Sequence, residues 1–236
     1  MAYPQPTMTP VIHADEDTRS RFLVRVYQHL GLAVLAFMAI ETLFFTLGIA
    51  EGIYDFLAAS GGVAWLLILG GFTIVNMIAG RSAHQLGNTT AQYGALFAMS
   101  AAEALIFAPF LYYVFKVAPT DGTTSVVSAA IVTAVGFAAL TVVAMTTRKD
   151  LSFLRPMLMW GGIVAIGLIV AAVAFGFQLG AIFSLAMIAL AGASILYQTQ
   201  QIVRRYPEWA YVGAAVSLFG SLMMMFWYVL QLFTRR

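Results

Sequence analysis

Seven long apolar runs, separated by short polar or charged connectors, constrain the fold of this chain more than any other feature. A helix needs roughly 20 mostly apolar residues to cross a bilayer. The predicted spans are Leu23–Ile49, Val63–Ala79, Tyr93–Phe115, Val126–Met145, Pro156–Phe175, Leu179–Val203 and Ala210–Phe233. The runs are too long for strands and do not alternate, and an open sheet would leave backbone groups unpaired in lipid. The pattern predicts an all-α integral membrane protein.

The composition agrees with a bilayer as the solvent. Of 236 residues, 61% are hydrophobic and only 9% are charged, whereas soluble domains carry about 25% charged residues. A soluble chain of this composition would lack the polar side chains to cover its surface. The sequence shows no basic tract of the kind that phosphate binding needs, which argues against a nucleic-acid partner. It also has no cysteine for disulfides or thiol chemistry.

The first residues are polar, with acidic side chains at 15–17 ahead of Arg19 and Arg21. A cleaved signal peptide begins basic and becomes apolar within a few residues. This leader does neither, so we expect the first helix to remain as an uncleaved anchor. The sequence therefore predicts a flexible polar cytoplasmic leader over residues 1–20 and a single seven-helix transmembrane domain over residues 21–236.

Basic residues divide unequally between the two sides of the predicted membrane. With the amino terminus in the cytoplasm, the cytoplasmic set is Arg19, Arg21, Arg25, Arg81, Arg148, Lys149, Arg155, Arg204 and Arg205, and the outer set is Lys116, Arg235 and Arg236. Because cytoplasmic loops carry the excess of Lys and Arg, we expect a cytoplasmic amino terminus and a carboxyl terminus on the outer side. Six spans with a re-entrant last segment would return that end to the cytoplasm. The last apolar run is long and uninterrupted, which favours seven spans.

Two glutamates lie inside predicted spans, where an ionisable group costs about 2.5–3.5 kcal/mol on insertion scales. Glu103 lies near the middle of the third span, and Glu41 lies in the outer half of the first. Neither has an evident cationic partner in the apolar runs. Two interpretations stay open: one or both carry protons or cations along an internal path, or each is protonated or hydrogen-bonded and serves packing.

Small and polar side chains recur on the last two spans. In the sixth span Ser194 and Gln198 are four residues apart and share a face. In the seventh, Gly213, Ser217 and Ser221 recur every four residues, a pattern that lets helices approach closely. We expect the two faces to pack together, and a functional switch at their contact is the alternative.

The sequence contains no pattern typical of a catalytic or metal site. His13, His29 and His84 lie in the leader, at the start of the first span and in a loop, without the spacing that binds zinc. We find no nucleophile–base pair, Walker loop or Gly-rich phosphate turn. We therefore expect no metal, no cofactor and no enzymatic activity.

Three segments are distinctive when taken together. They are the loop Thr146–Leu154 (TTRKDLSFL), the stretch Ile195–Ile202 (ILYQTQQI) and the stretch Ala215–Phe219 (AVSLF). In this order and spacing they resemble the Bax inhibitor-1 family, and in particular its bacterial YccA-like branch. The segments Val26–Leu32 and Ala108–Pro109 also fit, so the resemblance covers nearly the whole chain after the leader. It implies a bundle of six helices around a central one, in a bacterial inner membrane.

The resemblance implies two activities. Some members are pH-sensitive calcium leaks, whose switch is a pair of aspartates on the last two helices beside a basic residue at the end of the second. YccA is a modulator, and a slow substrate, of the membrane protease FtsH, alongside HflK and HflC. The two acids correspond here to Gln198 and Ser221, and the base to Arg81. Gln and Ser do not titrate near neutrality, so the resemblance favours FtsH modulation, with the leader gripped by the protease, over a leak that would use Glu103 or Glu41.

Overall fold

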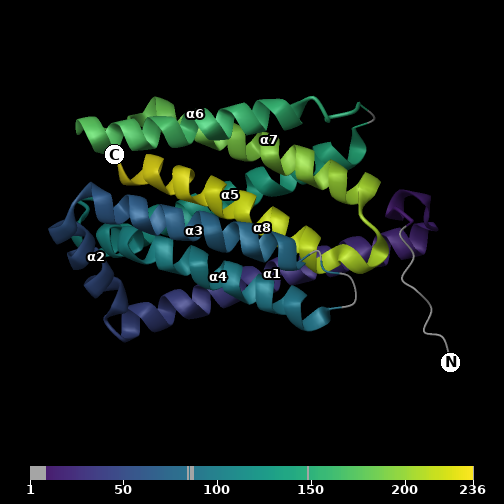
Figure 1. The fold of residues 1–236 in the computed structure, drawn as a ribbon, viewed down its shortest axis with the longest axis horizontal. Coiled ribbons are helices and arrows are strands. Elements are labelled where there is room, and N and C mark those ends of the chain that lie inside the picture. The colour runs from purple at the N-terminus through teal and green to yellow at the C-terminus, as the bar shows by residue number, and fades with distance from the viewer. Residues whose placement is uncertain (1–8, 84, 86–87, 148, 236) are drawn as a thin grey trace.

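The computed structural model describes residues 9–83, 85, 88–147 and 149–235, and regular structure in this part of the chain is helical apart from one isolated bridge. Seven of its helices are long and apolar enough to cross a membrane. In chain order they are α1 (Glu16–Thr46), α3 (Gly62–Ala83), α4 (Thr89–Tyr112), α5 (Gly122–Thr146), α6 (Leu154–Phe175), α7 (Ala181–Arg205) and α8 (Tyr211–Thr234). The seven predicted spans are therefore confirmed (Figure 1).

One helix was not predicted. The 12-residue helix α2 (Ile49–Ser60) follows α1 directly and is too short to span a bilayer. Gly48 and Gly61, with φ of 73° and 70°, turn the chain at its two ends. The Tyr112 hydroxyl at the end of α4 donates a hydrogen bond to Glu51 of α2 at 3.0 Å. This bond ties α2 to the end of α4.

The spanning helices alternate in direction, so their connections collect at two ends of the molecule (Figure 1). We call the N-side the end that holds the start of α1 and the α3–α4, α5–α6 and α7–α8 connections. We call the C-side the end that holds α2, the α4–α5 and α6–α7 connections and the end of α8. On the C-side, Arg235 donates a hydrogen bond to the carbonyl oxygen of Leu179, which precedes α7. The last helix therefore crosses the whole bundle, as seven spans require, and does not re-enter.

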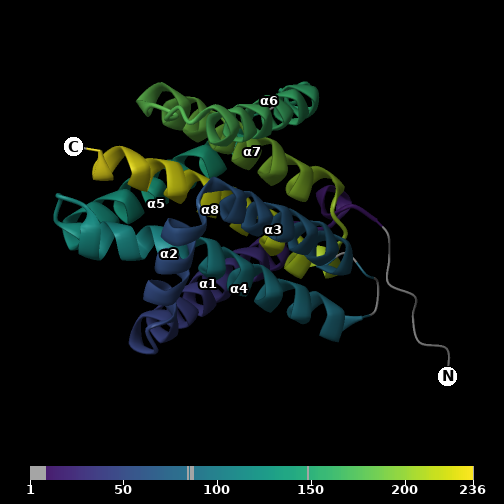
Figure 2. The same cartoon turned by 60° about the vertical axis from the view of Figure 1, so that its left-hand side comes forward.

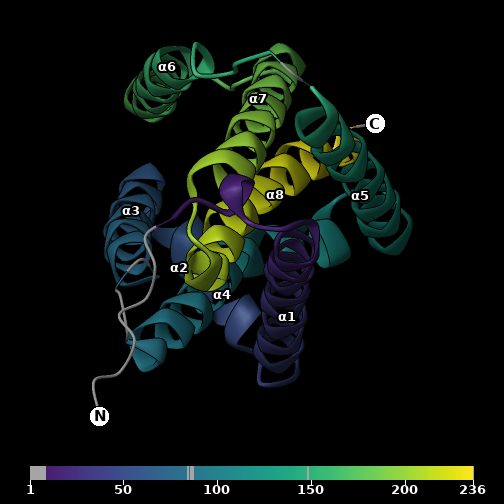
Figure 3. The same ribbon diagram turned by 90° about the vertical axis from the view of Figure 1, so that its right-hand side faces the viewer.

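Helix α8 is the central helix of the bundle. It lies among the other helices (Figure 3) and contacts α1, α3, α4, α5 and α7. Most of its side chains are buried. Phe219, Leu218 and Leu230 are among its fully buried side chains. The apolar face of nearly every spanning helix is therefore packed against this one helix, which the family resemblance implied.

Helix α6 lies at the edge of the bundle (Figure 2). It packs mainly on α7 and also meets α3. Gly62 at the start of α3 faces Val173 of α6, where an added Cβ would lie 2.5 Å from a valine methyl group. Its large side chains Trp160, Ile163 and Ile166 are exposed, as expected for a helix that faces lipid.

The structure describes the predicted leader from residue 9 onward, and this part contacts the turn between α7 and α8. Val11 is only 1% exposed, and its backbone N–H donates to the Tyr206 carbonyl oxygen at 2.9 Å. Pro10 forms a bridge with Pro207, and α1 already begins at Glu16. Burial of one apolar side chain and pairing with the α7–α8 turn order this stretch, which its polar composition concealed. Residues 1–8 lie outside the described part.

Gly122, the first residue of α5, packs against the π-helical turn Tyr113–Val117 that follows α4. A Cβ there would lie 2.7 Å from the Val114 carbonyl oxygen and 2.8 Å from the Phe115 Cα. Both are backbone atoms, so no side-chain rotation relieves the clash. We expect Gly122→Ala to destabilise the fold by about 1–3 kcal/mol, measured as a lower melting temperature in detergent. Gly31→Ala in α1, with no atom within 4 Å, is the matched control and should be neutral or slightly stabilising. Equal losses in the two variants would contradict the close approach.

Candidate functional site

A cavity of about 920 Å³ lies between α8 and helices α3, α4, α6 and α7. Its polar lining residues are Thr73, Asn76, Glu103, Gln178, Gln198, Ser217, Ser221, Gln231 and Arg235. They extend from the end of α8 on the C-side to the N-side half of α7 and α8. The volume lies within the range of roughly 300–1,000 Å³ that small-molecule sites occupy.

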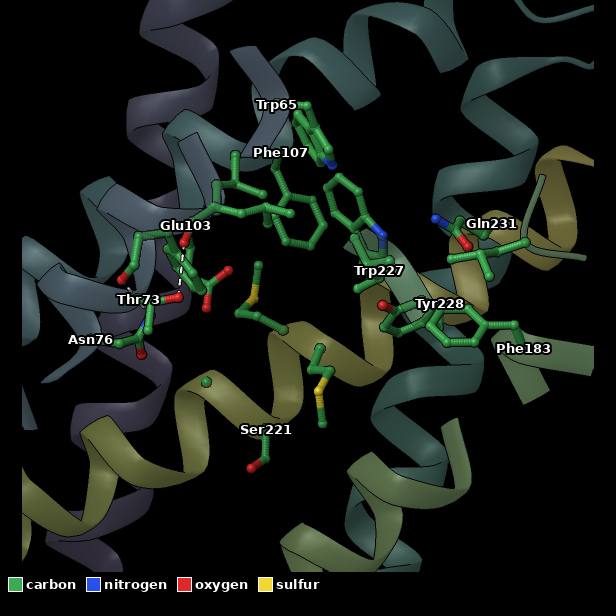
Figure 4. A pocket seen from close by; sticks show the side chains of 18 of the residues that line it. Trp65, Thr73, Asn76, Glu103, Phe107, Phe183, Ser221, Trp227, Tyr228 and Gln231 are labelled. Atoms are coloured by element: carbon green, nitrogen blue, oxygen red, sulfur yellow. Dashed lines mark hydrogen bonds between the residues drawn. The ribbon is translucent and has the colours of Figure 1, made fainter. Parts of the chain in front are cut away.

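Aromatic side chains form one wall of this cavity. The rings of Trp65 and Trp227 are stacked with their centroids 6.0 Å apart. Phe107 meets Trp227 edge-on at 4.9 Å. Figure 4 shows these three rings beside Glu103, which lies one helical turn before Phe107 on the same face of α4.

Glu103 supplies the one carboxylate among the described residues that line the cavity. The residue is 5% exposed, and it makes no hydrogen bond or ion pair with any described residue. Its neighbours in Figure 4 are Thr73 and Asn76. They donate instead to the backbone carbonyls of Leu69 and Phe72 in their own helix. The Glu103 carboxyl is therefore buried, unpartnered and directed at the hollow.

The structure brings Gln198 and Ser221 together across the α7–α8 contact. The Ser221 hydroxyl donates to Gln198 Oε1 at 2.9 Å, and the Gln198 amide donates to the Ser194 hydroxyl at 3.4 Å. On α8 the Ser217 hydroxyl donates to the Gly213 carbonyl oxygen at 3.0 Å. The small-residue face of α8 thus meets the polar face of α7, and we call the Gln198–Ser221 contact the gate.

Gln198 also lines a second cavity, of about 390 Å³, on the N-side. The other described residues around it include Arg205, Tyr206 and Trp209 from the end of α7 and the turn that follows. One side chain therefore borders both hollows, and the gate lies between them.

Arg81, the third residue of the implied switch, is not drawn into the gate. It lies near the N-side end of α3, next to Gly80, which does line the larger cavity. Its side chain is exposed and makes no hydrogen bond or ion pair with Gln198 or Ser221. A neutral amide and a hydroxyl give the guanidinium no charge to approach.

Glu41 occupies a different place from Glu103. It is 6% exposed, and both carboxyl oxygens are buried without a hydrogen-bond partner among the described residues. It lies one turn beyond Phe37, whose ring packs edge-on against Phe107 of α4. Glu41 does not line the large cavity. The two glutamates that look alike in the sequence differ in the structure, since Glu103 lines the cavity and Glu41 is buried away from it.

The family model for the inhibitor of apoptosis-promoting Bax1 matches residues 19–236. The chain belongs to the Bax inhibitor-1 family. Among curated proteins, it is 34% identical over 116 residues to the uncharacterized protein PA2604 of Pseudomonas aeruginosa. That match covers 48% of this chain and 51% of the relative, so the chain spans about half the length of the curated relative it matches.

Because the chain belongs to this family, its gate residues can be compared with the aspartate pair that the resemblance implies. The aspartate pair that the resemblance implies is replaced here by an amide and a hydroxyl that are hydrogen-bonded to each other. Neither group changes its charge near neutral pH, and an amide–hydroxyl bond contributes about 0.5–1.5 kcal/mol. In this member the contact is therefore a single neutral hydrogen bond of modest strength.

Gln200 is a site residue that the sequence analysis missed. It is 2% exposed, its amide oxygen accepts from the Leu151 backbone N–H at 2.7 Å, and its amide nitrogen donates to the Lys149 carbonyl oxygen at 2.8 Å. Ser152 donates to Asp150 from its hydroxyl and its backbone N–H, which holds the pKa of that carboxyl below its usual range. Gln200 thus ties the loop between α5 and α6 to α7. Its place in a run of polar residues was the one available signal.

The histidines and acids form no metal centre in the part of the chain that the structure describes. His29 is hydrogen-bonded through its ring nitrogens to the Tyr93 hydroxyl and the Arg25 carbonyl oxygen. His13 lies in the 3₁₀ turn Val11–His13, and His84 lies outside the described residues. His29 thus links α1 to α4.

Proposed function

We propose that this protein forms a gated pathway for small cations across the membrane. The observation that supports it best is the position of Gln198, which lines both the large cavity and the N-side cavity. In this proposal, movement of α7 against α8 breaks the contact between Gln198 and Ser221 and joins the two hollows. The pathway would then extend from the C-side end of α8 to the α7–α8 turn.

Glu103 is the group that attracts the cation in this proposal. Calcium binds oxygen ligands, and tight sites supply six to eight of them. The cavity offers one carboxylate with the scattered oxygens of Thr73, Asn76 and Ser221 nearby along its walls. Such a sparse set suits an ion that passes through better than an ion that is retained.

The gate in this proposal does not respond to protons. Gln198 and Ser221 carry no titrating group, so the flux of the natural protein lacks the proton switch that the family resemblance implies. Opening would depend on movement of α7 against α8. This distinguishes the proposed pathway from a pH-sensitive calcium leak.

The proposed orientation places the N-side in the cytoplasm of a bacterial cell, with the protein in the inner membrane. Described basic residues on the N-side are Arg19, Arg21, Arg25, Arg81, Lys149, Arg155, Arg204 and Arg205, and those on the C-side are Lys116 and Arg235. Arg148 and Arg236 lie outside the described residues. The positive-inside rule then directs the N-side inward.

Calcium flux into liposomes that contain the purified protein tests the pathway. We expect Glu103→Gln to lower the flux at least about tenfold, because a charged contact contributes about 1.5–3 kcal/mol and each 1.4 kcal/mol is a factor of ten. Glu41→Gln is the matched control, since it removes a buried carboxyl that does not line the cavity, and its flux should equal that of the natural protein. Flux that is absent, or unchanged by Glu103→Gln, would refute the proposal.

Modulation of FtsH, with HflK and HflC, is the second candidate, and the docking of the leader favours it. The leader is held to the α7–α8 turn through Val11 and Tyr206, and Tyr206 also lines the N-side cavity. A protease that gripped the leader would therefore pull on the helix pair that forms the gate.

Deletion of residues 2–9 tests this second candidate, because it leaves the docked segment in place. We expect the intact chain to co-purify with FtsH in mild detergent and the truncated chain to lose most of that association. Equal co-purification of both proteins would show that the leader is not the element recognised.

A further inference from the structure

The large cavity has the chemistry of a binding site for a particular class of ligand. We infer that it binds lipophilic organic cations, with Glu103 as the counter-charge and the Trp65–Trp227 wall as the aromatic surface. The Glu103 carboxyl is buried and unpartnered among the described residues, and it faces the hollow (Figure 4). An aromatic face within about 6 Å of a cation attracts it, and more strongly where water is excluded.

The apolar lining of the cavity favours an organic ligand. Most of the lining is apolar, with Leu69, Ile106 and Met223 among its members. Apolar walls do not retain a small metal ion, because they cannot replace its hydration shell, which is consistent with the passage without retention proposed above. A cation whose charge is spread over a large apolar surface loses little hydration on entry. The same walls then contribute by covering its hydrocarbon.

The charge distribution explains why the ligand is a cation. Arg235 is the other charged group among the described lining residues, and it lies at the C-side end of α8. There its guanidinium donates to the Leu179 carbonyl oxygen. Glu103 is in the middle of α4 and has no partner. The centre of the cavity therefore holds a carboxyl group without a cationic partner among the described residues, which can serve as the counter-charge when a bound cation favours its ionised form.

The position of the cavity explains how a lipid-soluble ligand reaches it. Its lining includes Thr73 of α3 and Phe177 beyond the end of α6, both exposed, the latter at 45%. Helix α6 is at the edge of the bundle, and its outward face is apolar. A ligand dissolved in the bilayer can therefore enter beside α3 and α6 without crossing the gate.

Binding of tetraphenylphosphonium to the purified protein tests the inference. It is measured by equilibrium dialysis, with matched empty micelles as the blank. Tetraphenylborate, an anion of the same shape, is the ligand control. We expect saturable binding of the phosphonium, and Glu103→Gln should raise its Kd at least about tenfold. Trp65→Leu, a second variant that keeps the carboxyl, should raise the Kd about threefold or more. Glu41→Gln should leave it unchanged.

The inference goes beyond cation flux and does not depend on it, because the readout is binding at equilibrium. Saturable phosphonium binding that is weakened by Glu103→Gln supports the site even if the liposomes show no calcium flux. Equal binding of cation and anion, binding indifferent to Glu103→Gln, or no saturable binding would each overturn it. Should Glu103→Gln fail to fold, the Trp65→Leu result decides, and an unchanged Kd there would also overturn the site.

Discussion

A double variant, Gln198→Asp with Ser221→Asp, is expected to turn the neutral gate into a pH-dependent one. The two side chains are already in hydrogen-bond contact, so two carboxyl groups placed there can share a proton at low pH. When that proton is lost, two like charges about 4 Å apart repel by roughly 4 kcal/mol at an effective dielectric constant of 20. Each 1.4 kcal/mol shifts an equilibrium tenfold. We therefore expect calcium flux in liposomes to rise more than tenfold as the pH increases through the loss of the shared proton.

The single variants separate this mechanism from a general effect of added charge. In Gln198→Asp alone, there is no second carboxylate to repel the new one when it ionises. In Ser221→Asp alone, the Gln198 amide can turn and donate instead. Both single variants should therefore show much weaker pH dependence than the double variant. A double variant whose flux is flat, or falls as the pH rises, would contradict a gate at this contact.

The spans could be predicted because length and hydropathy determine them almost alone. Each apolar run exceeds what a bilayer requires, and nothing in the tertiary structure overrides that need. Helix α2 (Ile49–Ser60) could not be found in this way, because it is short and contains Glu51 and Asp55. Its order depends on two left-handed glycines and on the bond from Tyr112, which is distant in sequence.

The contact between Gln198 and Ser221 follows from sequence spacing, since residues four apart share a helix face. The cavity beside that contact could not be predicted from sequence spacing. It exists because α6 packs at the edge of α7 and leaves space beside α3, and no local pattern encodes that arrangement. For the same reason the sequence could not distinguish Glu103 from Glu41. Both are single acids in apolar helices, and only packing decides which of them faces a hollow.

The contact between the leader and the α7–α8 turn could not be predicted from the sequence. Val11 and Ile12 are adjacent apolar residues within a polar stretch, and nothing in the surrounding composition marks Val11 as the buried one. Its partner, Tyr206, is almost two hundred residues away in sequence. Hydrophobic periodicity cannot predict the burial of a single side chain against a distant turn, because one residue has no period.

Replacing Glu41 by leucine is expected to stabilise the protein. Both Glu41 carboxyl oxygens are buried without a partner among the described residues, and a buried unsatisfied polar group costs about 1–3 kcal/mol. Leucine fills a similar volume without that cost. In a chain of this length about 1 kcal/mol shifts the melting temperature by about 2–4 °C. We therefore expect Glu41→Leu to raise the melting temperature in detergent by several degrees. Tryptophan fluorescence during heating measures this change.

Glu103→Leu is the matched comparison, because it removes the other intramembrane carboxyl. The Glu103 carboxyl faces a cavity of about 920 Å³ with polar neighbours, whereas Glu41 does not line that cavity. Its removal should therefore stabilise the fold less than Glu41→Leu does, while abolishing cation flux. A fall in melting temperature for Glu41→Leu would contradict the assignment of Glu41 as an unsatisfied packing residue. It would mean that this carboxyl holds a bound cation or proton that the fold needs, which would transfer the ion site from the cavity to the α1–α4 interface.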